Sequence, residues 1–298
     1  MSRSQKGLCM VILSGIVFGV MPSAVTFCYS QGVTASLVIL FRYIFLSLVL
    51  LPSAIKSHDL WNNYRANWKK LLFLTLAGTA TPLLLFTAYS SLPTGIATTI
   101  HFIYPVIVVL ICTVVFHERL SKGKMLCFAL CVGGILLMVE TSFQKLSTVG
   151  MLAAFLSSVT WGCYIVFLNK IDLQNVTSGQ IVFYVGIGSL VLITLYGILA
   201  GSFPAAVTGI GWVALIVSNL IIAVFGSIFF AIGTQYTDAQ SSAIASTLEP
   251  ITSIIVGVLF LNEHISVHSA AGAAMVLAAV TLLAVFSLKS AENVNTSV

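Results

Sequence analysis

The chain has 298 residues, of which 59% are hydrophobic and only 7% charged, and its mean hydropathy is +1.09. Soluble globular proteins carry about 25% charged residues, so this composition excludes a soluble fold and indicates a protein that crosses a membrane several times. The formal net charge of +5 does not imply a nucleic-acid partner, and the six cysteines do not form a pattern typical of a disulfide framework.

Ten apolar segments follow one another along the chain. About 20 helical residues cross a bilayer, and the expected spans cover residues 8–29, 35–55, 71–89, 94–116, 124–139, 148–168, 178–200, 211–233, 239–261 and 267–288. The first span is too long for the apolar region of an ordinary signal peptide, and no A-x-A cleavage site follows it. We therefore predict that it is a retained transmembrane helix.

The distribution of lysine and arginine supports an even number of spans. With ten spans and a cytoplasmic N-terminus, eleven of the thirteen basic residues fall on the inner side, while Lys145 falls outside and Arg42 lies within a span. This bias follows the positive-inside rule. The expected location is the cell (plasma) membrane, with both termini in the cytoplasm.

The two halves of the chain share one pattern. Pro105 matches Pro250, and Glu118 matches Glu263, both at an offset of 145 residues. Each half holds five spans, and an odd number of spans per repeat places the second repeat upside down relative to the first. Inverted repeats of this kind are typical of transporters with a site at the bilayer midplane.

We therefore predict an all-α membrane protein with ten transmembrane helices arranged as two inverted five-helix repeats. The predicted domains are a first repeat at residues 1–146, a second repeat at 147–290 and a cytoplasmic tail at 291–298.

The ninth span, 239–261, has Glu249 and Pro250 near its middle. A carboxylate at the bilayer centre costs roughly 2.5–3.5 kcal/mol even on lenient insertion scales, and a proline leaves a backbone carbonyl without its helical donor. In a continuous helix, Ser242, Ser246 and Glu249 share one polar face. This face is predicted to line a water-filled cavity that binds substrate, and the alternative is a seam of interhelical hydrogen bonds.

The fourth span places a histidine and a phenol at the equivalent positions. His101 corresponds to Ser246 and Tyr104 to Glu249, and both are candidates for the same cavity. A histidine titrates close to neutral pH in water, so His101 is either proton-sensitive or a buried hydrogen-bonding residue. Arg42, in the second span, stays charged and needs a partner. An ion pair with Glu249 is slightly favoured over binding of a substrate carboxylate.

Two aromatic residues and four prolines complete the candidate set. Trp161 and Tyr164 are candidates for substrate contact, with simple packing as the alternative. Gly15-Ile-Val-Phe-Gly19 forms a G-x-x-x-G face that permits close helix contact. The prolines expected to bend helices are Pro22, Pro82, Pro105 and Pro250.

Other chemistries lack support in the sequence. His264 and His268 lie four residues apart, but there is no H-E-x-x-H pattern, so no metal site is expected. The sequence contains neither a Walker A motif nor a G-x-S-x-G nucleophile motif. We expect no cofactor and no catalytic residue.

A longer pattern runs through both halves. It reads Ala88-Tyr89, Ala97-Thr98, Tyr104-Pro105 and Phe116-His-Glu118-Arg-Leu-Ser121 in the first half, and Gly233, Ser242-Ala243, Glu249-Pro250 and Leu261-Asn-Glu263-His-Ile-Ser266 in the second. This pattern resembles the drug/metabolite transporter superfamily, specifically its EamA group of ten-span carriers. Tyr104 stands where that group usually has glutamate, so the resemblance does not extend to a symmetric two-carboxylate mechanism.

The resemblance implies that spans 1–4 and 6–9 enclose a central cavity, with spans 5 and 10 at the periphery. Similar proteins export amino acids, related metabolites or drugs. The predicted function is therefore a secondary transporter of small organic metabolites, with export as the expected direction and alternating access as the mechanism. The expected partners are a small-molecule substrate, the lipid bilayer and, as a candidate, a coupling proton.

Alternative functions remain at this point. Within the same class, the protein could export multiple drugs or organic cations. From other classes come a channel, a non-transporting membrane receptor and an intramembrane enzyme.

Overall fold

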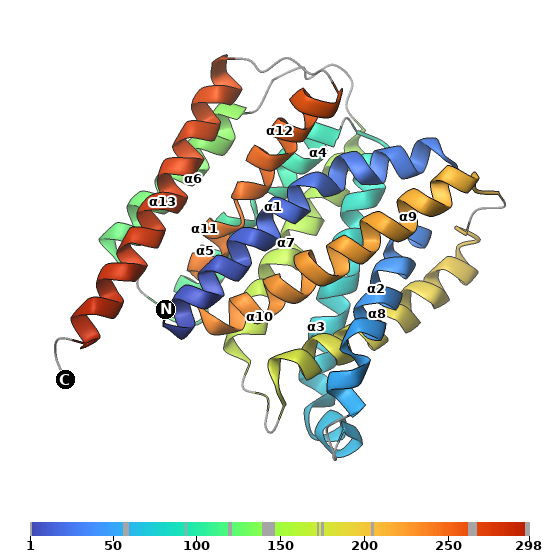
Figure 1. Cartoon of the computed structure of the whole chain (residues 1–298), viewed down its shortest axis with the longest axis horizontal. Helices are drawn as coiled ribbons and strands as arrows, with labels where there is room; N and C mark the ends of the chain where they lie inside the picture. Colours follow the sequence, from blue (N-terminus) through green and yellow to red (C-terminus); the bar gives the residue numbers. More distant parts are fainter. Residues whose placement is uncertain are drawn as a thin grey trace.

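The computed structural model describes residues 2–55, 60–92, 94–118, 121–138, 147–171, 173, 176–203, 206–261 and 267–295. Within these ranges the regular structure is entirely helical, as the sequence predicts, and the helices pack into one bundle (Figure 1). In chain order they are α1 (Arg3–Ser30), α2 (Ala35–Ile55), α3 (Leu60–Tyr89), α4 (Thr94–His101), α5 (Tyr104–Val114), α6 (Lys122–Met138), α7 (Thr148–Lys170), α8 (Ser178–Leu199), α9 (Gly209–Ile221), the π-helical segment η1 (Ile222–Ile228), α10 (Phe229–Tyr236), α11 (Ala239–Ala245), α12 (Leu248–Leu261) and α13 (Val267–Asn295).

Six stretches of the described chain are long and apolar enough to cross a membrane. They are Arg3–Ser30, Ala35–Pro52, Leu60–Tyr89, Thr148–Lys170, Ser178–Leu199 and Gly209–Tyr236. Tyr104–Val114 and Ala270–Leu283 are apolar but shorter. Of the residues named above, Lys145, Glu263, His264 and Ser266 lie outside the described residues.

The segments expected to form the fourth and ninth spans are not continuous helices, which corrects the expectation from the sequence. The fourth divides into α4 and α5, and the ninth into α11 and α12. Pro105 and Pro250 lie in the first turn of the second helix of each pair, where a missing N–H removes no helical hydrogen bond. In a continuous helix, the residues at positions 105 and 250 would donate their N–H groups to the carbonyls of His101 and Ser246, and proline has no N–H to donate. The Glu249 N–H instead donates to the Ser246 carbonyl at 3.1 Å.

The other two prolines behave differently, because α1 and α3 continue through Pro22 and Pro82 without interruption. The apolar segment Gly209–Tyr236 contains the π-helical segment η1, a feature that nothing in the sequence predicts.

The two halves pack against each other reciprocally. The first helix of each half lies along the third span of the other, since α1 contacts α9, η1 and α10 while α7 contacts α3. α2 packs on α8, and α6 on α13. Figure 1 shows α6 and α13 side by side at one edge of the bundle.

Two ion pairs join the halves at one end of the bundle. Lys124 Nζ lies 2.7 Å from Asp238 Oδ1, and Lys170 pairs with Glu118. Asp238 also caps α11 by accepting a hydrogen bond from the Ser241 N–H at 2.9 Å. Burial by itself raises the pKa of the Asp238 carboxyl, but the Lys124 ammonium and the hydrogen bonds from Ser241 outweigh burial and hold the pKa below its ordinary value.

We expect Asp238→Asn to lower stability slightly, by about 0–1 kcal/mol at pH 7. Asparagine caps a helix as well as aspartate, so this change removes the ion pair and one acceptor oxygen, Oδ2, which receives the Ser241 hydroxyl at 2.7 Å. Asp238→Ala also removes the cap. Because the folded pKa is depressed, the contribution of the ion pair is present above the unfolded carboxyl pKa of about 3.9 and is lost as the pH falls through the folded value. The melting temperatures of the two proteins should therefore differ at pH 7 and converge once the pH lies below the folded pKa of Asp238. A constant difference would contradict this assignment.

Candidate functional site

A cavity lies between helices of both halves. About 720 Å³ there is not filled by protein atoms, including the part open to solvent, and about 60 Å³ accommodates the centres of water-sized molecules. One water needs about 10–15 Å³ by that measure, so the space holds several waters or a small solute. Its lining comes from α1–α4, α7, α8, η1, α10 and α12, and no described residue of α6 or α13 contributes. The polar and charged lining side chains are Arg42, Tyr43, Thr81, His101, Tyr164, Ser227 and Glu249.

Glu249 occupies the first turn of α12, and its residue is 6% exposed. The amino end of a helix carries a partial positive charge that favours a carboxylate, so the break at Pro250 creates a place for this acid. Among the described residues, no side chain or backbone group donates a hydrogen bond to its carboxylate. Glu249 therefore presents its acid to the cavity, where a solute can reach it.

Arg42 extends from α2 into the same cavity. Its Nε and Nη2 donate to Ser227 Oγ at 3.2 and 3.0 Å, and its guanidinium carbon lies 5.2 Å from the centre of the Phe18 ring. The favoured prediction of an Arg42–Glu249 ion pair is wrong, because the ion pairs of the described residues are the two at the end of the bundle. The guanidinium is held instead by a neutral hydroxyl.

His101 ends α4 and also lines the cavity. Its Nδ1 lies 2.8 Å from Ser157 Oγ, and that hydroxyl donates its proton to the Ala154 carbonyl at 2.6 Å. Ser157 therefore accepts from His101, so Nδ1 carries a proton. In the neutral imidazole, Nε2 is then the acceptor.

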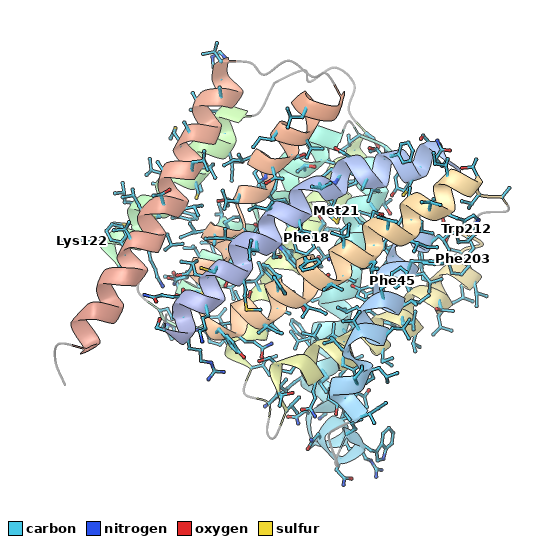
Figure 2. The ribbon with its side chains drawn as sticks, in the orientation of Figure 1. Phe18, Met21, Phe45, Lys122, Phe203 and Trp212 are labelled. Atoms are coloured by element: carbon cyan, nitrogen blue, oxygen red, sulfur yellow. The ribbon has the colours of Figure 1, made fainter. Side chains whose placement is uncertain are left out.

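A stack of aromatic rings forms one side of the cavity. Trp161 lies nearly parallel to Tyr164, with ring centres 5.3 Å apart, and 4.7 Å from Phe230. The Phe18 ring meets Trp161 edge-on at 6.4 Å. Figure 2 places Phe18 and Met21 at the middle of α1, between this helix and the α9–α10 span. These aromatic side chains line the same cavity as Arg42 and Glu249.

The structure does not bring Tyr104, Ser246 and Ser242 to the cavity. The Tyr104 hydroxyl donates to Ser246 Oγ at 2.8 Å, because Ser246 gives its own proton to the Ser242 carbonyl at 2.9 Å. This pair joins the two helix breaks across the halves. Ser242 Oγ is buried and has no hydrogen-bond partner among the described residues. For Tyr104 and Ser246 the geometry is that of an interhelical seam.

We expect Tyr104→Phe to lower the free energy of unfolding by roughly 0.6–1.5 kcal/mol, the contribution of one interhelical hydrogen bond. Ligand binding in the cavity should stay unchanged, because the hydroxyl points to Ser246. Thermal melting in detergent and a binding titration measure the two effects separately. A binding defect at unchanged stability would place Tyr104 in the site after all.

Several lining residues are not predicted from the sequence. Tyr43 follows Arg42 directly, and its hydroxyl donates to the Gly78 carbonyl at 2.7 Å. Ser227 and Phe230 lie in or after η1. The sequence gives one indication of the role of Ser227: it stands beside Gly226 in an otherwise apolar run, and a hydroxyl in a membrane needs a hydrogen-bond partner.

Comparison with known proteins now assigns the family. Residues 5–140 and 148–285 each match the profile described as the EamA-like transporter family. The chain belongs to the EamA-like transporter family. It carries two copies of the EamA repeat, and it is a membrane protein with transmembrane helices.

Two relatives carry transporter names. The uncharacterized transporter YvbV of Bacillus subtilis is 24% identical over 201 residues, which cover 64% of this chain and 63% of YvbV. An uncharacterized transporter of Archaeoglobus fulgidus is 24% identical over 279 residues, covering 93% of this chain and 96% of that protein. A solved crystal structure superposes with a TM-score of 0.77 at 16% identity, covering 95% of this chain and 98% of the other, and shows the same fold.

Proposed function

We propose that this EamA-family protein is a secondary transporter of small metabolites that carry both an ammonium and a carboxylate, such as amino acids and related compounds. The observation that carries the proposal is the presence of Arg42 and Glu249 in one cavity without an ion pair between them. An acid and a guanidinium that do not form an ion pair with each other are complementary to the ammonium and the carboxylate of a zwitterion. In this arrangement Arg42 binds the carboxylate and Glu249 the ammonium.

The aromatic stack supports a small apolar substituent on the same solute. Trp161 and Phe230 offer a flat surface, and the space for water-sized molecules, about 60 Å³, suits a compact molecule. His101, whose Nδ1 bond to Ser157 leaves Nε2 as an acceptor, adds a second group for the ammonium or for bound water. Glu249 is the candidate for a coupling proton.

The proposed architecture has ten spans in two inverted repeats, at residues 1–146 and 147–290, followed by a cytoplasmic tail at 291–298. The reciprocal packing of α1 and α7, and the equivalent breaks before Pro105 and Pro250, support two repeats related by a pseudo-twofold axis. Alternating access then consists of one repeat moving against the other around the cavity, with net export.

The charges at the ion-paired end support a plasma-membrane orientation with cytoplasmic termini. Arg3 lies over the Tyr236 ring at 4.5 Å, and Tyr236 ends the helix just before Asp238. Lys124 and Lys170 belong to the ion pairs at the same end. Basic residues gather where the positive-inside rule places the cytoplasm.

Counterflow in proteoliposomes tests this function. We expect saturable exchange of labelled L-leucine or L-phenylalanine, and no exchange of phenethylamine, which lacks the carboxylate. Absence of exchange across a broad panel of zwitterions, with folded protein in the membrane, would refute the proposal.

One alternative has an observation in its favour. An acid beside stacked aromatic rings, here Glu249 with Trp161 and Phe230, suits an organic cation. Arg42 in the same cavity opposes that reading. Transport of tetraphenylphosphonium in place of zwitterions would select the multidrug alternative.

A further inference from the structure

The π-helical segment η1 interrupts the span that faces α1 and α2. Single π-helical turns within α-helices occur frequently at functional sites, because their i→i+5 bonds accommodate one extra residue. One residue corresponds to about 100° of rotation in an α-helix. The segment therefore determines which side chains of the following turn face the cavity. Ser227 and Phe230, three residues apart, both do so.

The segment is fastened to α1 by two close contacts. Ser14 Oγ donates to the Gly226 carbonyl at 2.9 Å. A Cβ atom at Gly226 would lie 2.8 Å from the edge of the Phe18 ring, so glycine is needed for the ring to lie against η1. These contacts fix the backbone of η1 directly beside Ser227.

Ser227, in η1, forms hydrogen bonds with the guanidinium of Arg42 in α2. Its hydroxyl oxygen accepts from both Nε and Nη2, while Nη1 lies 3.7 Å from the Met21 sulfur. A hydroxyl restricts the plane of the guanidinium but does not cancel its charge, as a carboxylate would. The guanidinium therefore keeps its positive charge, and its remaining N–H groups can donate to an anion.

We infer that Ser227 is a positioning residue for Arg42, and that the π-helical turn brings it there so that the cavity selects solutes with an anionic group. The inference deepens the proposed function, on which it rests for the identity of the transported anion. It assigns to η1 a role in specificity: a return of residues 222–228 to α-helical register would turn Ser227 away and release the guanidinium.

Anion binding can be measured without knowing the substrate. The chain has four tryptophans, and replacing Trp61, Trp68 and Trp212 by phenylalanine leaves Trp161 in the cavity as the one reporter. Iodide, an anionic quencher, and caesium, a cationic quencher, are then titrated against the purified full chain in detergent. Arg42→Gln defines the quenching that does not depend on the guanidinium.

We expect Ser227→Ala to raise the iodide concentration for half-maximal quenching about tenfold, the effect of losing hydrogen bonds to a charged group. Ser227→Thr, which keeps the hydroxyl, should behave like the parent protein. Ser227→Asp gives Arg42 a permanent internal counter-charge and should reduce iodide quenching to the level of Arg42→Gln. Caesium quenching should be unchanged in Ser227→Ala. Ser218→Ala is the matched control, because that hydroxyl, on the same span, donates to the Ala214 carbonyl.

Each outcome decides the inference. Iodide quenching that is the same in the parent protein and in Ser227→Ala or Ser227→Asp would overturn it, as would quenching that Arg42→Gln leaves unaltered. If Ser227→Ala does not fold, the comparison of Ser227→Thr with Ser227→Asp carries the test. A Ser227-dependent iodide response in a protein that exchanges no zwitterion would uphold the positioning role and refute the proposed function.

Discussion

Glu249→Gln is expected to reduce zwitterion transport about 100-fold while the protein stays folded. Glutamine keeps the shape of the side chain and removes the charge, and losing one partner of a buried charge pair costs on the order of 2–5 kcal/mol. The carboxylate has no hydrogen-bond partner among the described residues, so its replacement breaks no internal hydrogen bond. Initial rates of counterflow at several solute concentrations, together with melting temperature, measure both effects.

The control for this experiment is Glu249→Asp, which retains the acid on a side chain shorter by one methylene. We expect it to keep a measurable part of the transport that Glu249→Gln loses. If Glu249→Gln transports at the rate of the unchanged protein, the acid is not part of the site. If both variants melt far below the parent protein, the role of Glu249 is in folding.

The helical class could be predicted because it follows from composition and from the lengths of the apolar runs. Both halves of the chain also share one sequence pattern, with Pro105 in the first half and Pro250 in the second. The two matches to the EamA family, at residues 5–140 and 148–285, cover these halves. The internal course of the spans was harder to predict. Pro105 and Pro250 suggested bends, yet whether a proline bends a helix or divides it depends on what its neighbours offer to the released carbonyl. At Pro22 and Pro82 the helix continues.

The prediction of a single polar face on the segment 239–261 is wrong for this reason. Ser242, Ser246 and Glu249 share a face only in a continuous helix. The structure ends α11 at Ala245 and begins α12 at Leu248. Ser242 therefore lies in α11, Ser246 follows its last residue, and the acid lies in α12. Glu249 reaches the cavity, whereas Ser246 meets Tyr104 across the break.

The partner of Arg42 could not be read from the sequence either. Charge pairing favoured Glu249, because a buried cation usually requires an acid. The actual partner, Ser227, reaches the guanidinium from a π-helical segment, and hydropathy along the sequence gives no indication of that change in helical register. The G-x-x-x-G face, by contrast, was predicted as a close-contact surface. Gly15 lies against the break between α11 and α12, and Gly19 against Glu249 and Thr252 of α12.

Gly19→Ala and Gly15→Ala form a matched pair with opposite expected outcomes. A Cβ atom at Gly19 would lie 2.5 Å from the Glu249 carbonyl oxygen and 2.4 Å from Thr252 Cβ, so α1 and α12 would have to separate. Overpacking of this kind typically costs 1–3 kcal/mol. At Gly15 the nearest atom, the Ser246 carbonyl oxygen, would lie 3.5 Å away, an ordinary contact.

We therefore expect Gly19→Ala to lower the melting temperature clearly and to reduce transport, because the turn of α12 that moves carries Glu249. Gly15→Ala should leave both nearly unchanged, since the added methyl group fits the available space and alanine has the higher helix propensity. Melting curves and counterflow rates for both variants, measured in one lipid composition, make the comparison. Equal effects would mean that α1 does not set the position of Glu249 through Gly19. A loss of transport in Gly19→Ala at nearly unchanged melting temperature would show instead that a displacement of α12 too small to unfold the bundle is enough to misplace the acid.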